Sequence, residues 1–313
     1  MKSYSIDDVT VVVIGRNEAT NLPRCFASIQ RLTRRIVFVD SNSSDRSVEI
    51  AREYGIPVIV VLDSNFYSAA LGRMVGAKKC ETSLMQFLDG DMELAPDWIP
   101  TAIQFMNRNQ KAAVVHGFKR EFKNEKDLEH YSIKADKKNW RSDYLQGAYL
   151  IKRDVYRESG GLDPRFPGEE ERDLYVRIHD IGHEVWYIHH LMSSHYDFKD
   201  RGWRYLFVSD VAGTVSIPLA KSLNNGKLLA CLYVYRRLVP VLVADIMSFI
   251  ALLSFSWVGL IGAIGIQFVA FFYALLIGRP GYFIIWKSAL LNIHRTVRLM
   301  RRDIQCSERV VSA

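Results

Sequence analysis

The N-terminal part of this chain repeats one pattern, in which a short and continuous apolar run is followed by a polar, helix-like segment. The apolar runs cover residues 9–14, 36–39, 57–62 and 84–88 and are rich in valine, isoleucine and phenylalanine. Runs of this kind are typical of strands that are buried on both faces of a parallel sheet. The pattern predicts a wound α/β sheet, and such sheets bind ligands at the carboxyl ends of their strands.

Acidic residues after the first, second and fourth runs are candidates for a ligand site. Glu18 comes after the first run, Asp40 ends the second, and Asp89 and Asp91 follow the fourth. A parallel sheet would gather these side chains along one edge, where carboxylate oxygens can hold Mg²⁺ or Mn²⁺ against a phosphate. By itself, an Asp-Gly-Asp segment after a strand is equally typical of an ordinary solvated turn. The first run is not followed by Gly-x-Gly-x-x-Gly or by a Gly-Lys-Ser/Thr loop, which argues against a dinucleotide dehydrogenase and a P-loop NTPase.

The composition narrows the class of protein. Lys and Arg outnumber Asp and Glu by 41 to 34 in 313 residues, an excess that suits nucleotide phosphates and acidic lipid headgroups alike. The four cysteines are far apart in the sequence, so we expect reduced thiols rather than a zinc site or disulfides. No secretory signal is recognisable at the N-terminus, and the N-terminal domain is therefore expected to stay in the cytoplasm.

A long apolar region lies near the C-terminus. From Leu238 to Gly278 the only charged side chain is Asp245. One helical span needs about 20 apolar residues, so this region is long enough for two passes. Arg236 and Arg237 before it and Arg279 after it favour a transmembrane hairpin with both ends in the cytoplasm. A buried hairpin of a soluble protein is the alternative, and another helix, a lipid headgroup or water is the expected partner of Asp245.

Five segments together carry a resemblance to a known family. Residues 11–18, 39–47 and 87–91, followed by residues 160–166 and 169–177, resemble in order and spacing the family 2 glycosyltransferases of the GT-A fold. The similarity extends over about residues 8–200. The resemblance implies a nucleotide-sugar donor, a divalent metal (Mn²⁺ or Mg²⁺) and transfer with inversion at the anomeric carbon.

The resemblance also implies roles for individual residues. It places Gly15, Arg16 and Glu18 along the nucleotide pocket, Asp40 at the base or ribose, and Arg73 near the diphosphate. Asp89 would contact the ribose or the metal, Asp91 would be the main metal ligand, and His195 would be a further ligand. An ordinary surface or core histidine is the alternative for His195.

An inverting transfer needs a base for the acceptor hydroxyl. The family carries a Glu-Asp pair for this purpose, and Glu170-Glu171 aligns with it. Because the second acid is Glu here, the choice among Glu169, Glu170 and Glu171 stays open, with Glu171 favoured. Three glutamates can also simply begin a helix favourably through its dipole. A second departure is Met74, which stands where the family usually has Asn and weakens the expected diphosphate contacts.

The sequence thus predicts a GT-A domain over residues 1–205, a linker over 206–236, a transmembrane hairpin over 237–278 and a basic amphipathic segment over 279–313. The expected activity is that of a metal-dependent hexosyltransferase that transfers a sugar from a UDP- or GDP-sugar to a lipid-linked or polysaccharide acceptor. Such an enzyme would act in cell-envelope glycan or exopolysaccharide synthesis at the inner membrane, with its catalytic domain cytoplasmic and without nucleic acid. A catalytically inactive membrane scaffold and a metal-dependent nucleotidyltransferase are the alternatives.

Overall fold

The computed structural model describes residues 3–62, 64–122, 138–166, 168, 170–196, 221, 229, 236, 239–276, 301 and 303–311. The chain forms two compact units. One contains residues 1–200 together with residues 302–313, and the other contains residues 201–301. The last residues of the chain therefore belong to the same unit as the first.

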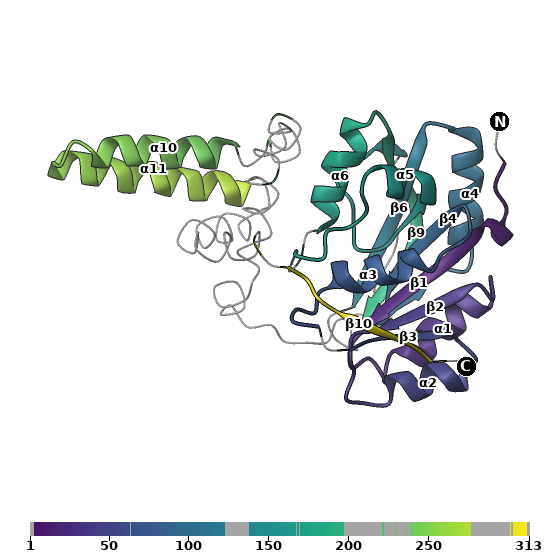
Figure 1. The fold of residues 1–313 in the computed structure, drawn as a ribbon. Helices are drawn as coiled ribbons and strands as arrows, with labels where there is room; N and C mark the ends of the chain where they lie inside the picture. Colours follow the sequence, from purple (N-terminus) through teal and green to yellow (C-terminus); the bar gives the residue numbers. More distant parts are fainter. Residues whose placement is uncertain are drawn as a thin grey trace. The chain divides into compact units, whose positions relative to one another are not determined.

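The first unit is built on one mixed sheet in the strand order β10-β3-β2-β1-β4-β8-β6-β9-β5, with β7 paired to β9 (Figure 1). Its strands are β1 (Val9–Gly15), β2 (Ile36–Asp40), β3 (Val58–Leu62), β4 (Leu84–Asp89), β5 (Met92–Leu94), β6 (Ala112–Phe122), β7 (Trp140–Arg141), β8 (Tyr149–Lys152), β9 (Glu184–Tyr196) and β10 (Ser307–Val311). Its helices are η1 (Ile6–Asp8), α1 (Leu22–Gln30), α2 (Ser47–Glu53), α3 (Ala69–Lys78), α4 (Trp98–Arg108), α5 (Arg153–Glu158) and α6 (Glu170–Asp180).

Strands β3, β2, β1 and β4 are parallel neighbours, which confirms the wound α/β sheet predicted from the apolar runs. Every residue of β2 is buried, as are all but the ends of β3 and β4, because helices cover both faces of this part of the sheet. Helix α3 packs especially close to β1: a Cβ atom on Gly76 would lie 2.3 Å from Val12 Cγ1. A glycine is therefore required at this contact.

The other half of the sheet is antiparallel in part and was not predicted. Strand β8 runs antiparallel to both β4 and β6, whereas β9 runs parallel to β6 with several register shifts. The pairing of β6 with β9 places Glu121 opposite His195, and the pairing of β5 with β9 places Met92 opposite His195. These strands bring the C-terminal end of β9 next to the loop after β4.

Strand β10 was also not predicted. It pairs antiparallel with β3, from Ser307 opposite Leu62 to Val311 opposite Val58, and it covers what would otherwise be the edge of the sheet. The amphipathic segment was predicted over residues 279–313. Residues 279–300 lie outside the described part of the chain, and residues 307–311 form this strand instead because β3 offers an unpaired edge.

The second unit contains two apolar helices, α10 (Val239–Leu252) and α11 (Trp257–Leu276), which pack against each other. In the described part of the chain, α11 is the one helix long and apolar enough to cross a bilayer, and α10 is shorter. The structure thus contains a helical hairpin, but it does not show that the hairpin crosses a membrane twice.

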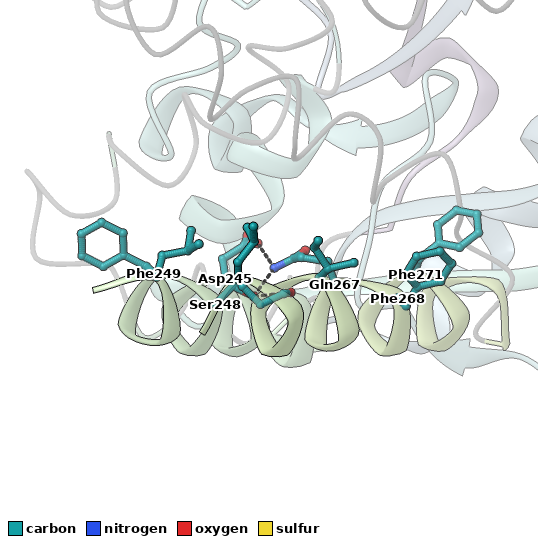
Figure 2. A pocket seen from close by; sticks show the side chains of 10 residues that line it. Asp245, Ser248, Phe249, Gln267, Phe268 and Phe271 are labelled. Atoms are coloured by element: carbon teal, nitrogen blue, oxygen red, sulfur yellow. Dashed lines mark hydrogen bonds between the residues drawn. The ribbon is translucent and has the colours of Figure 1, made fainter. Parts of the chain in front are cut away.

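A polar cluster joins the two helices where an apolar cavity of 720 Å³ opens between them (Figure 2). Gln267 Nε2 of α11 donates hydrogen bonds to Asp245 Oδ1 at 3.1 Å and to Ser248 Oγ at 2.8 Å, both on α10. Another helix, a lipid headgroup or water was expected to be the partner of Asp245, and the structure shows a hydrogen bond to the other helix.

Candidate active site

The predicted gathering of acidic residues at one edge of the sheet is confirmed. In the register of the parallel strands, Gly15 at the end of β1 lies beside Asp40 at the end of β2, and Ile14 lies beside Asp89 at the end of β4. Gly90 donates its N–H to the carbonyl of Ile14 at 2.8 Å, which holds the loop after β4 against β1. The carboxyl ends of these strands therefore lie next to one another.

The two loops that follow β1 and β2 are tied to each other. Asn17 and Asn42 both have a φ of 58°, a left-handed conformation that asparagine tolerates better than most residues. The N–H of Asn17 donates to Ser43 Oγ and its side-chain oxygen accepts from the N–H of Ser44, both at 2.8 Å. Ser47 Oγ accepts from the N–H of Glu18 at 3.0 Å. These bonds fix the backbone around Gly15, Arg16 and Glu18.

Asp40 is completely buried below these loops. Its carboxylate accepts hydrogen bonds from the hydroxyl and the N–H of Ser43, the latter at 2.8 Å. Burial raises the pKa of Asp40 above its ordinary value, although the bonds from Ser43 act in the opposite direction. Here Asp40 shapes the loop after β2, and its predicted contact with a base or ribose remains a prediction.

Arg16 projects from the loop after β1 and lies over an aromatic ring. Its guanidinium carbon is 4.8 Å from the centre of the Tyr67 ring, and the Tyr67 hydroxyl accepts a hydrogen bond from Asn42 Nδ2 at 3.2 Å. Tyr67 therefore links the loops after β1, β2 and β3. It is one of the site residues that the sequence analysis missed.

Arg73 is at the centre of a buried cluster of charges. Its Nη2 lies 2.7 Å from Asp89 Oδ1, its Nη1 lies 2.9 Å from Glu171 Oε1, and Nη1 also pairs with Glu170. The Arg73 side chain is only 3% exposed. Burial alone would lower the pKa of Arg73, but the three carboxylates raise it well above its ordinary value.

This cluster connects helix α3, strand β4 and the first turn of helix α6. Glu170 and Glu171 begin α6, where the helix dipole favours negative charge. Both also pair with Arg73, so they favour the start of the helix and belong to this cluster as well. A Cβ atom on Gly147 would lie 3.1 Å from Arg73 Nη2 and 3.5 Å from Glu171 Oε1. The loop before β8 thus passes directly beside the cluster. Glu169 lies outside the described residues.

Asp91 and His195, which are 104 positions apart in the sequence, meet beside this cluster. His195 Nε2 is 3.2 Å from Asp91 Oδ2, and the other ring nitrogen, Nδ1, is 2.6 Å from Glu121 Oε2. Lys119 Nζ in turn contacts Glu121 Oε1 at 2.7 Å. Burial lowers the pKa of His195, but the hydrogen bonds to Asp91 and Glu121 outweigh this effect and raise the pKa to about 9.

Glu121 was missed in the sequence because its contact with His195 depends on the pairing of β6 with β9. Burial opposes ionisation of Glu121, but the bonds from His195 and Lys119 lower its pKa to about 2. Three consecutive charged residues, Lys119, Arg120 and Glu121, lie near the end of β6, and their sequence does not identify the strand on which a partner lies.

The residues around Asp91 fit a metal that is held partly by the protein and partly by a phosphate. Asp91 Oδ1 is buried without a hydrogen-bond partner, so one carboxylate oxygen is available as a ligand. Among the described residues, no group of three or more His, Cys, Asp or Glu side chains is arranged as a complete metal site. Mg²⁺ is commonly bound by one or two carboxylates together with substrate phosphates, which agrees with this arrangement.

Comparison with known proteins assigns the N-terminal domain to a family. Residues 10–161, just under half of the chain, match the family described as Glycosyl transferase family 2. The N-terminal domain of this chain belongs to that family. The described site lies within the matched residues, apart from α6 and His195.

Two curated relatives share parts of this family 2 domain. The 4,4'-diaponeurosporenoate glycosyltransferase of Staphylococcus haemolyticus is 32% identical over 92 residues, which is 28% of this chain and 24% of the relative. The undecaprenyl-phosphate 4-deoxy-4-formamido-L-arabinose transferase of Pseudomonas paraeruginosa is 33% identical over 114 residues, which is 33% of this chain and 34% of the relative. The chain thus spans about a third or less of the length of these relatives.

Solved structures show that the fold of this family 2 domain is GT-A. Residues 1–349 of S. aureus TarS superpose with a TM-score of 0.55 at 13% identity, covering 72% of this chain and 71% of TarS. Glucosyl-3-phosphoglycerate synthase from Mycobacterium tuberculosis, in complex with Mg²⁺ and UDP, superposes with a TM-score of 0.52 at 15% identity, covering 71% and 84%. GalNAc-T7 with UDP, GalNAc and Mn²⁺ has a TM-score of 0.52 at 17% identity, covering 68% and 47%.

Proposed function

We propose that this protein is an inverting, metal-dependent glycosyltransferase that transfers a sugar from a nucleotide-diphosphate donor to a lipid-linked acceptor. The observation that carries the proposal is the site at the ends of β1, β2 and β4, in which a buried carboxylate oxygen of Asp91 has no partner and a cluster of acids surrounds Arg73. Two solved structures of similar fold contain UDP together with Mn²⁺ or Mg²⁺, which supports this class of donor.

In this proposal Asp91 and His195 hold Mn²⁺ or Mg²⁺, and Asp89 contributes to the metal or to the ribose. The metal would stabilise the negative charge of the departing diphosphate. The loops tied together by Asn17 and Ser43 would bind the nucleoside, with Arg16 and Glu18 along the pocket.

Glu171 is the proposed base, and Arg73 is the residue that positions it. Attack by the acceptor hydroxyl requires removal of its proton, and Glu171 lies at the same edge of the sheet as Asp89, to which Arg73 connects it. Arg73 was expected beside the diphosphate. Its contacts with Asp89, Glu170 and Glu171 give it the further role of fixing the acids relative to the donor site.

A lipid-linked acceptor is supported by two separate observations. One relative of the family 2 domain is named as a transferase that uses undecaprenyl phosphate. In addition, α10 and α11 form an apolar hairpin with many exposed large side chains, and a membrane would cover them. A cytoplasmic catalytic domain at the inner membrane would have access to such an acceptor.

Calorimetric titration of detergent-purified protein with UDP and with GDP tests the proposal, each with Mn²⁺ and with EDTA. We expect metal-dependent binding of one nucleotide by the wild type, and its loss in Asp91→Ala. Asp7→Ala serves as the control, because Asp7 is exposed in η1, which precedes the opposite end of β1. Absence of binding by a folded wild type would favour the inactive scaffold, and product formation from a sugar phosphate and a nucleoside triphosphate would favour a nucleotidyltransferase.

A further inference from the structure

The last described residues of the chain, 303–311, form a return segment that joins the sheet of the catalytic unit. Five register pairs connect β10 to β3, and Ser307 Oγ donates to the carbonyl of Leu62 at 3.3 Å. This segment follows the apolar hairpin and lies far beyond residues 10–161, to which the family match is confined. It therefore lies outside the part of the chain that matches the family.

The return segment also contacts the loop that leaves β3. Asn65 Nδ2 donates a hydrogen bond to the carbonyl of Asp303 at 2.8 Å, and the N–H of Asn65 donates to the carbonyl of Gln305 at 3.4 Å. Asn65 thus bonds to two backbone carbonyls of the segment, to one through its side chain and to the other through its backbone. These contacts continue the β10–β3 pairing beyond the end of the strand.

The loop held in this way leads directly into the candidate donor site. Two residues after Asn65, the ring of Tyr67 lies under the Arg16 guanidinium, and its hydroxyl accepts from Asn42. The next residue, Ser68, caps α3 by accepting from the N–H of Leu71 at 3.1 Å, and α3 carries Arg73. A continuous set of contacts therefore runs from the return segment to two loops of the site.

We propose that the return segment positions the donor-binding loop, so that residues 303–311 are a functional part of the nucleotide site. Without the contacts to Asn65, the loop over residues 64–68 would lose its hydrogen bonds to Asp303 and Gln305, and Tyr67 would hold Arg16 less well. Ordering a loop in its bound conformation before the ligand arrives improves affinity. The effect on nucleotide affinity rests on the proposed function, but the effect on the loop does not.

Hydrogen–deuterium exchange of the full-length, nucleotide-free protein tests the loop itself. In Asn65→Ala we expect faster exchange at residues 64–68 than in the wild type, with unchanged exchange in β1 and β4. Asn107→Ala is the matched control, because Asn107 fastens Tyr4 through two hydrogen bonds, of 2.8 and 2.9 Å, without contacting this loop. Unchanged exchange at residues 64–68 in Asn65→Ala would overturn the proposal whether or not the protein binds nucleotide.

Titration of the nucleotide that the wild type binds tests the consequence for the site. We expect about three- to tenfold weaker binding in Asn65→Ala, which corresponds to the loss of one hydrogen bond, and a greater loss in a chain that ends at Arg302. Asn107→Ala should bind as the wild type does. Equal affinity of Asn65→Ala and the wild type would overturn the positioning role. If the wild type binds no nucleotide while the loop of Asn65→Ala exchanges faster, the proposed function fails and the structural part of this proposal stands.

Discussion

Asp91 and Asp89 are separated by one residue, yet their surroundings differ. Asp89 is paired with Arg73, whereas Asp91 faces His195 with one oxygen and has no hydrogen-bond partner for the other. A carboxylate that is already neutralised by a buried guanidinium is a weaker ligand for a metal. The structure therefore favours Asp91 over Asp89 as the main metal ligand.

Glu121 is expected to orient His195 toward the metal. The bond from Nδ1 to Glu121 turns Nε2 toward Asp91, so that a metal held by Asp91 would take the place of the Nε2 proton. Loss of such an outer partner typically weakens metal affinity by about 10- to 100-fold. We expect a decrease of this order in the Mn²⁺ affinity of Glu121→Gln in the presence of the bound nucleotide, measured by electron paramagnetic resonance of free Mn²⁺. Glu93→Gln is the control, since Glu93 bonds Tyr196 rather than His195. Wild-type Mn²⁺ affinity in Glu121→Gln would contradict this role.

Arg73 is expected to be the residue of the site on which folding depends most. Arg73→Met would leave three carboxylates without their buried cation, and breaking a buried ion pair commonly costs about 3–5 kcal/mol. We expect a loss of stability of this order in thermal unfolding, and a smaller loss in Arg73→Lys. The control is Arg46→Met, whose partner Glu53 and own side chain are 59% and 71% exposed, so that the expected cost is below about 1 kcal/mol. A similar small cost for Arg73→Met would show that the cluster is not held by its charge.

At the scale of elements, the contact of α3 with β1 depends on a single glycine. In Gly76→Ala, the new Cβ would meet Val12 Cγ1 at 2.3 Å and Val39 Cγ2 at 3.0 Å. We expect a loss of about 1–3 kcal/mol from overpacking, in spite of the better helix propensity of alanine. In Gly72→Ala the nearest atom would be Ile14 Cγ2 at 3.3 Å, so this variant should lose less stability than Gly76→Ala in the same thermal unfolding experiment. Equal stability of the two variants would contradict the packing argument.

The elements that could be predicted from the sequence are those with a local signal. Strands β1 to β4 are continuous apolar runs because both of their faces are buried, and their acidic ends follow from the parallel arrangement. Strand β10 has no such signal, since the segment from Ser307 to Val311 is largely exposed and its partner β3 lies about 245 positions earlier. The Arg73–Glu171 contact was equally hidden, because sequence spacing does not reveal which helix faces which strand end.

At the scale of the whole molecule, β10 restricts how the apolar hairpin can meet a membrane. Residues 3–196 and 303–311 contribute to one sheet, so both must lie on the same side of any bilayer. A single crossing by α11 would place them on opposite sides. At about 1.5 Å per residue, α11 is long enough to span the hydrocarbon core and α10 is not. If the chain between the two parts of the sheet enters a membrane, it must therefore leave the membrane on the same side.

Labelling with a membrane-impermeant thiol reagent can test this topology in cells that express the protein. Cys25 and Cys80 are buried and Cys306 is partly exposed, so a Cys231→Ser background makes Cys306 the reporter for the return segment. Asp7→Cys in a Cys306→Ser version of that background reports on the N-terminal domain. We expect both sites to be protected in intact cells and labelled after the cells are opened, because the sheet requires both to lie on one side of the membrane, which we propose to be the cytoplasmic side. If Cys306 is labelled in intact cells while position 7 is protected, β10 cannot pair with β3 in the membrane-bound protein, and α11 would then be a single-pass anchor.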